Sequence, residues 1–429
     1  MKKIAFTICA KNYIGLAQVL ERSIKDHNDN IDFYIFVADE FLTLDDTNSL
    51  PNNVLVAKDV LNFSKDKWNE LSFKYDLTEF CTCLKPTCFK YIFNQYNPDA
   101  CIYFDPDILV FNTLDYIFEQ LENYSIIVTP HITSIQEIYS GKLKEQGLFF
   151  TGMFNLGFLA LKGDSTANKM LNWWEVRLED RCFRNGLENY FTDQKWMDFL
   201  PTFYPTQLLI SFHLGLNFAP WNFYEREIVN IDNSYFVKNR LEDDKNTIYP
   251  LIFVHYSGFN YQSLLSDQVS SANIAELEIF DDLNCLFNEY SNYLKDSNLS
   301  KFINLSYSYN YFLNETNISL VYRRLYRRMQ EDGLIKSNPF DSKEKFYMLL
   351  NKSGLMRSNM INSDKSSIQN IANVERKTVL INKLFFIFYK IVGGDNFFQL
   401  VRLMRLYSKI ENHVYIIEKG YFKKFNIRT

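Results

Sequence analysis

Cys101-Ile-Tyr-Phe-Asp-Pro-Asp-Ile-Leu-Val-Phe111 is the stretch of this sequence that says most about its fold. A short apolar run bounded by polar or turn residues predicts a buried strand. Pro106 cannot donate a hydrogen bond to a sheet, so we expect the strand to end or bend there. Asp105 and Asp107 should therefore lie at the carboxyl end of a buried strand, the edge at which open α/β sheets bind ligands.

The two carboxylates have two interpretations. They repel each other unless a positive charge lies between them, and a hard divalent cation that also holds phosphate oxygens prefers such ligands. Alternatively, Asp105 or Asp107 caps a helix in a turn and no metal binds. The pair alone leaves both interpretations open.

Length and composition narrow the class of protein. A chain of 429 residues with 47% apolar residues should form two or three domains with a substantial core. The net charge of −5 argues against nucleic acid as the main partner. Seven cysteines without a C-x-x-C pair are expected to be reduced, mostly buried thiols of a cytoplasmic protein. The apolar run at the start ends by Lys11, which is too short for a signal peptide.

Hydrophobic spacing predicts strands that alternate with helices over the first half of the chain. Such alternation indicates βαβ units and a mixed, mostly parallel α/β sheet. The expected strands are 3–10, 33–38, 54–57, 101–104, 125–129 and 154–161, and the expected helices are 13–25, 84–93 and 167–178.

The character of the chain changes after residue 262. We expect a catalytic domain over 1–262 and a mainly helical accessory region over 263–429. From residue 374 onward there are 11 Lys and Arg against 4 Asp and Glu. Two arginine pairs, 323–324 and 327–328, could form a basic helix face or a solvated surface.

Seven separated motifs together resemble the A-type, Rossmann-like nucleotide-sugar glycosyltransferases. Within these the chain looks closest to the retaining branch that includes glycogenin and bacterial lipopolysaccharide galactosyltransferases, and the resemblance covers roughly residues 1–260. The matching stretches are Ile8-Cys-Ala-Lys-Asn-Tyr13, Leu84-Lys-Pro86, Tyr103-Phe-Asp-Pro-Asp107, Phe154-Asn-Leu-Gly157, Asp193-Gln194, Asn217-Phe-Ala-Pro-Trp-Asn222 and His255-Tyr-Ser-Gly258.

The resemblance implies a metal site. Asp105 and Asp107 match the family's metal-binding carboxylates, and His255 matches a histidine that completes the site around Mn²⁺ or Mg²⁺. Such an ion bridges the donor diphosphate and offsets the charge that builds on the leaving group. Taken alone, a histidine on an apolar strand is more often a satisfied core residue.

The resemblance also implies roles in binding the donor sugar. Asn155 matches a sugar contact, and Asp193 and Gln194 match the pair beside the anomeric carbon. Gln194 could steady an oxocarbenium-like transition state, while Asp193 could instead be a helix N-cap. Lys85 is either a diphosphate contact or a solvated helix residue.

Asn12 and Tyr13 match positions that hold the nucleoside. Ala10 stands where uridine-binding relatives often place an aspartate, which puts a uridine donor in doubt. The segment after His255-Tyr-Ser-Gly258 has no cation where relatives carry a lysine. Leaving-group stabilisation would then come from the metal, from Lys85, or from Arg177 or Lys195.

The resemblance therefore implies a metal-dependent retaining transferase. It would move a hexose from a nucleoside-diphosphate sugar to a glycan or glycolipid acceptor of a bacterial surface polysaccharide. The rivals are a nucleotidyltransferase on a similar sheet, which lacks support from a Gly-rich basic loop near residue 10, and a non-catalytic sugar-binding scaffold.

The basic, aromatic C-terminal segment also has two interpretations. It could lie on an anionic membrane surface, which would place the protein at the inner face of the membrane. Alternatively, it is a helical bundle that packs its aromatic residues on the catalytic domain and solvates its charges.

Overall fold

The computed structural model describes residues 1–41, 50–242, 247–266, 268–270, 280–336, 338–357 and 371–423. Contacts divide the chain into two compact units. Unit 1 comprises Met1–Asn62 and Leu77–Tyr307, and unit 2 comprises Phe63–Asp76 and Ser308–Thr429. These units differ from the boundary expected at residue 262, and the division into a catalytic and an accessory region stays a prediction.

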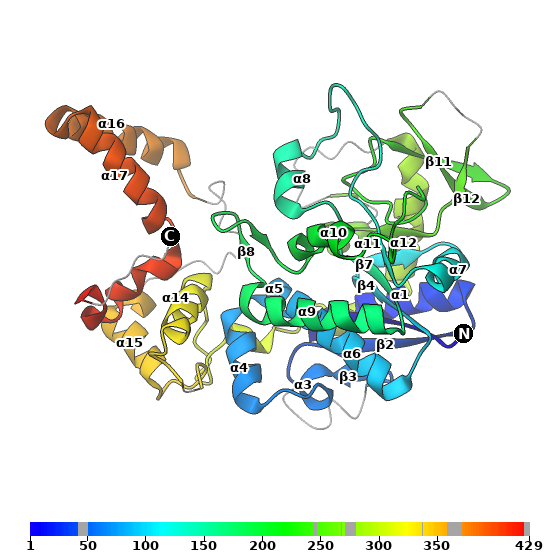
Figure 1. Ribbon diagram of the computed structural model, residues 1–429, viewed down its shortest axis with the longest axis horizontal. Helices are drawn as coiled ribbons and strands as arrows, with labels where there is room; N and C mark the ends of the chain where they lie inside the picture. Colours follow the sequence, from blue (N-terminus) through cyan, green and yellow to red (C-terminus); the bar gives the residue numbers. More distant parts are fainter. Residues whose placement is uncertain are drawn as a thin grey trace. The chain divides into compact units, whose positions relative to one another are not determined.

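Unit 1 is built around a seven-stranded sheet with the order β10-β6-β7-β4-β1-β2-β3 (Figure 1). Neighbouring strands are parallel except at β7, which is antiparallel to β4 and β6. The predicted mixed, mostly parallel α/β sheet is confirmed. The strands are β1 (Lys3–Cys9), β2 (Ile31–Val37), β3 (Val54–Val56), β4 (Ala100–Phe104), β6 (Ile126–Val128), β7 (Phe158–Lys162) and β10 (Leu208–Ile210).

Helices cover both faces of this sheet. α1 (Ile14–His27) and α7 (Asp115–Asn123) contribute Ile14, Leu20 and Ile117 to one core. On the other face, Phe89 of α6 (Lys85–Tyr96) packs edge-on against Phe6 of β1 at 4.7 Å, and α9 (Ser165–Arg181) lies beside α6. Because both faces are covered, the central strands are apolar throughout.

The turn after β4 leaves the main sheet, as Pro106 predicted. β4 ends at Phe104, and β5 (Ile108–Val110) pairs antiparallel with β14 (Phe253–His255) in a separate two-stranded sheet. In this register His255 lies opposite Ile108. Two segments about 150 residues apart in the chain are thereby joined beside Asp107.

All seven cysteines are free thiols and five are buried, as expected.

Smaller elements complete unit 1. The remaining strands are β8 (Arg184–Asn185), β9 (Tyr190–Phe191), β11 (Arg226–Ile231), β12 (Ser234–Asn239) and β13 (Tyr249–Pro250). The remaining helices are α3 (Ala57–Val60), α5 (Leu77–Cys83), α8 (Glu145–Thr151), α10 (Leu200–Phe203), α11 (Tyr261–Leu265), α12 (Asn284–Lys295) and α13 (Leu299–Phe302).

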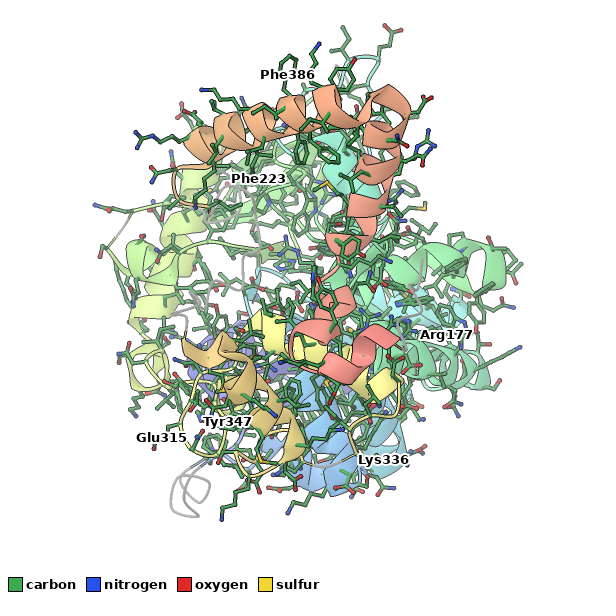
Figure 2. All side chains as sticks on the ribbon, turned by 90° about the vertical axis from the view of Figure 1, so that its left-hand side faces the viewer. Arg177, Phe223, Glu315, Lys336, Tyr347 and Phe386 are labelled. Atoms are coloured by element: carbon green, nitrogen blue, oxygen red, sulfur yellow. The ribbon has the colours of Figure 1, made fainter. Side chains whose placement is uncertain are left out.

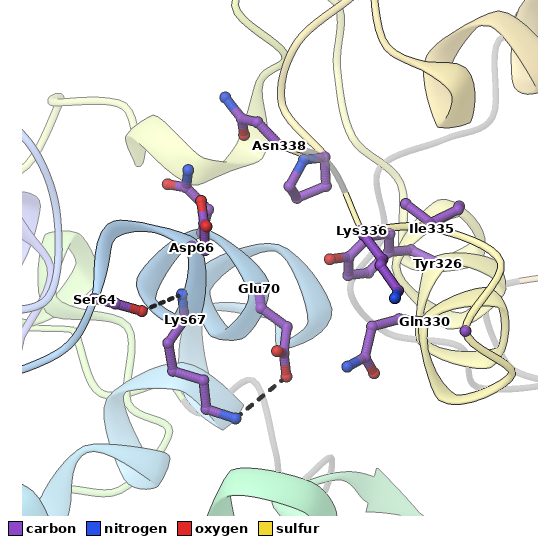
Figure 3. Close-up of a pocket in the computed structure, with 12 residues that line it drawn as sticks. Ser64, Asp66, Lys67, Glu70, Tyr326, Gln330, Ile335, Lys336 and Asn338 are labelled. Carbon is purple, nitrogen blue, oxygen red and sulfur yellow. Dashed lines mark hydrogen bonds and ion pairs between the residues drawn. The ribbon is translucent and has the colours of Figure 1, made fainter.

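Unit 2 packs α4 (Lys65–Lys74), α14 (Leu320–Glu331) and α15 (Lys345–Ser353) around aromatic residues. Phe73 of α4 lies 4.8 Å from Tyr326 of α14 and 5.7 Å from Phe346 of α15, measured between ring centroids. A polar pocket of about 420 Å³ opens between α4 and α14 (Figure 3). Glu70 in its wall is an ion-pair partner of Lys67 at 3.4 Å.

The arginine pairs on α14 are buried, so the expectation of a basic face or a solvated surface was wrong. Arg323, Arg324, Arg327 and Arg328 are each at most 5% exposed. Arg323 donates from Nη1 to the carbonyl oxygens at the end of α4, with distances of 3.1 Å to Ser72, 2.7 Å to Phe73 and 2.8 Å to Tyr75. A guanidinium thus supplies the donors that the last turn of α4 needs.

α16 (Val374–Val392) and α17 (Gly394–Tyr407) form what we call the C-terminal hairpin. Phe397 of α17 packs edge-on against Phe385 and Tyr389 of α16. Neither helix buries a residue in the part of the chain that the structure describes. Among the described residues, no helix combines the length and apolar content needed to cross a membrane.

Candidate active site

Asp105, Asp107 and His255 meet at the edge where β4 ends. His255 Nε2 lies 3.1 Å from Asp107 Oδ1 and 3.8 Å from Asp105 Oδ2. One ligand atom from each residue lies within 4.8 Å of the others. The imidazole is buried, whereas the Asp105 side chain is 29% exposed. The structure therefore brings together the three residues expected to bind a metal.

Asn155 sets the orientation of His255. Asn155 Oδ1 accepts from the backbone N–H of Gly157 at 3.1 Å and from Nδ2 of Asn217 at 3.2 Å, so this end of the amide is the oxygen. His255 Nδ1 lies 3.2 Å from the same oxygen and must be the donor. Nε2 is then the nitrogen that faces the two carboxylates, an arrangement that orients metal-binding histidines.

Gly157 makes room for the imidazole. A Cβ at this position would lie 2.4 Å from His255 Cε1 and 2.9 Å from Asn155 Oδ1. Asn155 and Gly157 belong to the turn before β7 rather than to the strand itself, which was expected to begin at 154. The turn thus places the Asn155 side chain against His255, while Gly157 leaves the space that a Cβ would fill.

Burial and charge oppose each other in this cluster. Burial alone would raise the pKa of Asp107, but the adjacent His255 lowers it. Burial would likewise lower the pKa of His255, but Asp107 and Asp105 raise it. The two carboxylates therefore outweigh burial and hold the pKa of His255 above its usual value.

Lys85 links the carboxylates to the predicted sugar-binding pair. Its Nζ lies 2.8 Å from Asp193 Oδ2 and 3.7 Å from Asp105 Oδ1, and it donates to the carbonyl of Leu156 at 2.8 Å. The side chain is 2% exposed, so the alternative of a solvated helix residue was wrong. Burial would lower the pKa of Lys85, but Asp193 and Asp105 raise it, and the ammonium stays charged.

Asp193 and Gln194 lie at the start of a short 3₁₀ helix, Gln194–Phe199. Asp193 occupies the N-cap position, but its side chain makes no capping hydrogen bond and pairs with Lys85 instead. Gln194 donates from Nε2 to the carbonyl of Thr151 at 2.8 Å, and its Oε1 accepts from the backbone N–H of Leu156 at 3.0 Å. Both side chains are held in fixed orientations at the same end of the sheet.

Asn12 and Tyr13 lie in the 3₁₀ turn Lys11–Tyr13 that follows β1. Tyr13 packs edge-on against Tyr261 at 5.9 Å, and burial together with Asp107 raises its pKa. Asn12 Oδ1 is buried and has no hydrogen-bond partner among the described residues. Their contact with a nucleoside stays a prediction.

Arg177 and Lys195 have other partners. Arg177 lies over the ring of Trp173, and Lys195 pairs with Asp198 at 2.7 Å. Neither is positioned by a contact with the carboxylate cluster. Of the cations weighed for the leaving group, Lys85 is the one in ion-pair contact with Asp105.

Sequence reasoning gave no role to several residues that shape the site. Tyr103 donates to Asp105 at 2.5 Å and Tyr261 donates to Asp107 at 3.3 Å. Tyr103 and Asp105 are two residues apart, so strand alternation could have placed them on one side. Trp221 packs edge-on against His255 at 5.3 Å, and nothing in the local sequence indicates that contact.

Comparisons with known proteins give structural neighbours only. No known protein family and no curated protein matches the sequence. The galactosyltransferase LgtC, solved with donor and acceptor sugar analogues, is 15% identical over 69% of this chain and 96% of its own, with a TM-score of 0.40. The glycosyltransferase GlyE of Streptococcus pneumoniae is 14% identical over 73% and 67%, with a TM-score of 0.37.

The bifunctional glycosyltransferase WbbM is 14% identical over 70% of this chain and 51% of its own, with a TM-score of 0.36. All three are named as glycosyltransferases. The likeness is too low to carry an assignment, which therefore rests on the topology and the side-chain geometry of this chain.

Proposed function

We propose that this protein is a metal-dependent retaining glycosyltransferase. It moves a hexose from a nucleoside-diphosphate sugar to a glycan or glycolipid acceptor of a bacterial surface polysaccharide. The convergence of Asp105, Asp107 and His255 at the carboxyl edge of the sheet carries this proposal. That edge is where sheets of this topology bind nucleotides.

The residues present fit a divalent cation. Carboxylate oxygens suit Mg²⁺ and Mn²⁺, and a neutral imidazole nitrogen completes a set suited to Mn²⁺. Asn155 already directs His255 Nε2 toward the carboxylates. When bound, the cation offsets the negative charge that develops on the departing diphosphate.

The chain's own residues would position the donor sugar. Gln194, held by Thr151 and Leu156, presents its amide beside Asn155, and its oxygen can face positive charge at the anomeric carbon. Asp193 is held in place by its contact with Lys85 and would bind sugar hydroxyls. Lys85 would add positive charge near the diphosphate.

The nucleotide site differs from that of uridine-binding relatives at one position. Ala10 is 2% exposed at the end of β1 and offers no carboxylate to read a uracil edge. Asn12 Oδ1 and Tyr13 remain to hold the base or ribose. We infer a cytoplasmic enzyme, since donors of this class and free thiols belong to that compartment.

The test is turnover of a panel of nucleotide sugars by the full-length protein with Mn²⁺ or Mg²⁺. We expect hydrolysis or transfer with at least one donor, and its loss by at least about 10³-fold in Asp107→Ala. Asp115→Ala, at an exposed carboxylate on α7, is the matched control and should keep activity. Undiminished transfer in Asp107→Ala would remove the metal role.

The same panel separates the rivals. Consumption of nucleoside triphosphates with release of pyrophosphate would identify a nucleotidyltransferase, and binding without turnover would identify a scaffold. NMR of the product linkage tests retention, and an inverted anomer would remove the role given to Gln194.

A further inference from the structure

The C-terminal hairpin exposes large apolar side chains over most of its surface. Ile391 is 75% exposed, Phe386 61% and Phe398 60%. Figure 2 shows Phe386 pointing away from the ribbon. A monomeric protein rarely leaves so large a contiguous apolar surface without a binding partner. The other large apolar residues exposed on the two helices are Val379, Leu380, Ile381, Leu384, Ile387, Phe388, Tyr389, Leu400, Val401, Leu403, Met404 and Tyr407.

Three of the four basic residues of α16 form a narrow stripe along the helix. Arg376, Lys383 and Lys390 are spaced seven residues apart, which is close to two helical turns and places them on one side. Every position from Leu384 to Tyr389 is an aliphatic or aromatic residue. α17 repeats the pattern, with Gln399, Arg402 and Arg405 interrupting Phe397–Leu406. The hairpin is amphipathic, with a broad apolar part and a basic edge.

We propose that the C-terminal hairpin docks the protein on the surface of an anionic lipid membrane. Residues 374–407 contain six basic and two acidic residues, a net charge of +4 in a chain of net charge −5. Apolar side chains enter the boundary between headgroups and acyl chains, while the basic stripe meets lipid phosphates. Lys383 lies in the middle of α16, where only an orientation parallel to the surface keeps its ammonium at headgroup level.

Charge favours lipid over a second copy of the chain. A partner hairpin would bring the same basic stripe, and like charges repel. An anionic surface neutralises the stripe and solvates the apolar side chains together. The rest of the chain has a net charge of −9, so attraction to an anionic surface comes from the basic C-terminal segment and should weaken as salt rises.

Co-sedimentation of full-length protein with vesicles tests this proposal. We expect binding to phosphatidylcholine vesicles that contain phosphatidylglycerol, and much weaker binding to phosphatidylcholine alone. The variant Arg376→Gln/Lys383→Gln/Lys390→Gln should bind on the order of 100-fold more weakly, as expected for three surface cations. The matched control Lys169→Gln/Lys301→Gln/Lys352→Gln removes the same charge from exposed sites elsewhere and should bind like the wild type.

Apolar contact is tested by Phe386→Asp/Ile387→Asp, which should abolish vesicle binding with an unchanged helical circular dichroism spectrum. Asp107→Ala should bind vesicles normally, so docking and catalysis can fail independently. Equal binding by the triple variant and its control would overturn the proposal. The proposal would also be overturned if the full-length protein did not bind vesicles and instead formed a concentration-dependent dimer that Phe386→Asp/Ile387→Asp dissociates.

Discussion

Two clusters of charged side chains, one in each unit, differ in what their charged groups contact. The guanidinium groups on α14 in unit 2 donate to fixed protein acceptors, including backbone carbonyls and Glu411. The carboxylates and imidazole in unit 1 instead direct one ligand atom each toward a common point. Burial of charge is common to both clusters, so burial alone does not mark a functional site.

The largest effect should come from removing the donor that several buried carbonyl oxygens share. Arg323→Met would leave the carbonyls of Ser72, Phe73 and Tyr75 without their donor, and we expect unit 2 to lose about 3–5 kcal/mol of stability. Hydrogen exchange resolved by peptide measures this loss unit by unit. Arg376→Met on the exposed hairpin is the control and should change stability by less than about 0.5 kcal/mol.

Asp107→Ala gives the other side of the comparison. Asp107→Ala leaves His255 without its partner, and the imidazole can then be neutral, whereas Arg323→Met leaves several buried carbonyl oxygens without a donor. Asp107→Ala should therefore cost unit 1 much less stability than Arg323→Met costs unit 2. Similar losses of stability in both variants would show that the carboxylate cluster is as important for folding as the buried arginines.

The next prediction concerns the acid dependence of stability in unit 1. Burial lowers the pKa of His131, beside Gln194, to about 4, so the native state stays neutral while the unfolded chain takes up a proton below about 6.5. Stability of unit 1 should fall as pH falls between these values, by up to about 1.4 kcal/mol per pH unit from this residue. Arginine contributes no such slope.

Denaturant titrations of wild type and His131→Phe across this pH range measure the difference. The variant should show a shallower acid dependence, whatever its absolute stability. Identical slopes would show that His131 is protonated in the native protein.

The orientation of His255 supplies the next prediction. Asn155→Ala removes the acceptor for His255 Nδ1, and loss of such a support typically weakens metal binding by about 10–100-fold. Calorimetric titration with Mn²⁺ alone measures this effect without a donor sugar. Asn168→Ala, on the exposed side of α9, is the control. Unchanged Mn²⁺ affinity would reduce Asn155 to the sugar contact that the sequence predicted.

The sequence was most informative where local pattern and topology agree. Alternating strands and helices predicted the sheet, and Pro106 predicted the bend that frees Asp107 from it. The meeting of His255 with the carboxylates needed the antiparallel pairing of β14 with β5, which no local pattern specifies. Only the family resemblance suggested that contact.

Arginine burial shows why other features could not be predicted. The i and i+4 spacing of Arg323 and Arg327 is the same for a solvated helix face and for a buried one. The acceptors that decide between them are carbonyls of α4, about 250 residues away. Long-range partners of this kind leave no trace in the sequence around the arginine.

The smallest predicted effect tests how finely the carboxylates are tuned. Tyr261 donates to Asp107 Oδ2 at 3.3 Å, a long contact, while Tyr103 donates to Asp105 Oδ1 at 2.5 Å. Tyr261→Phe should change Mn²⁺ affinity by no more than about fivefold, equivalent to a hydrogen bond of about 1 kcal/mol. Tyr103→Phe should have the larger effect, since the shorter bond to a carboxylate is the stronger one. If Tyr261→Phe weakened Mn²⁺ binding as much as Asn155→Ala, the tyrosine would belong to the metal site as fully as the residue that orients His255.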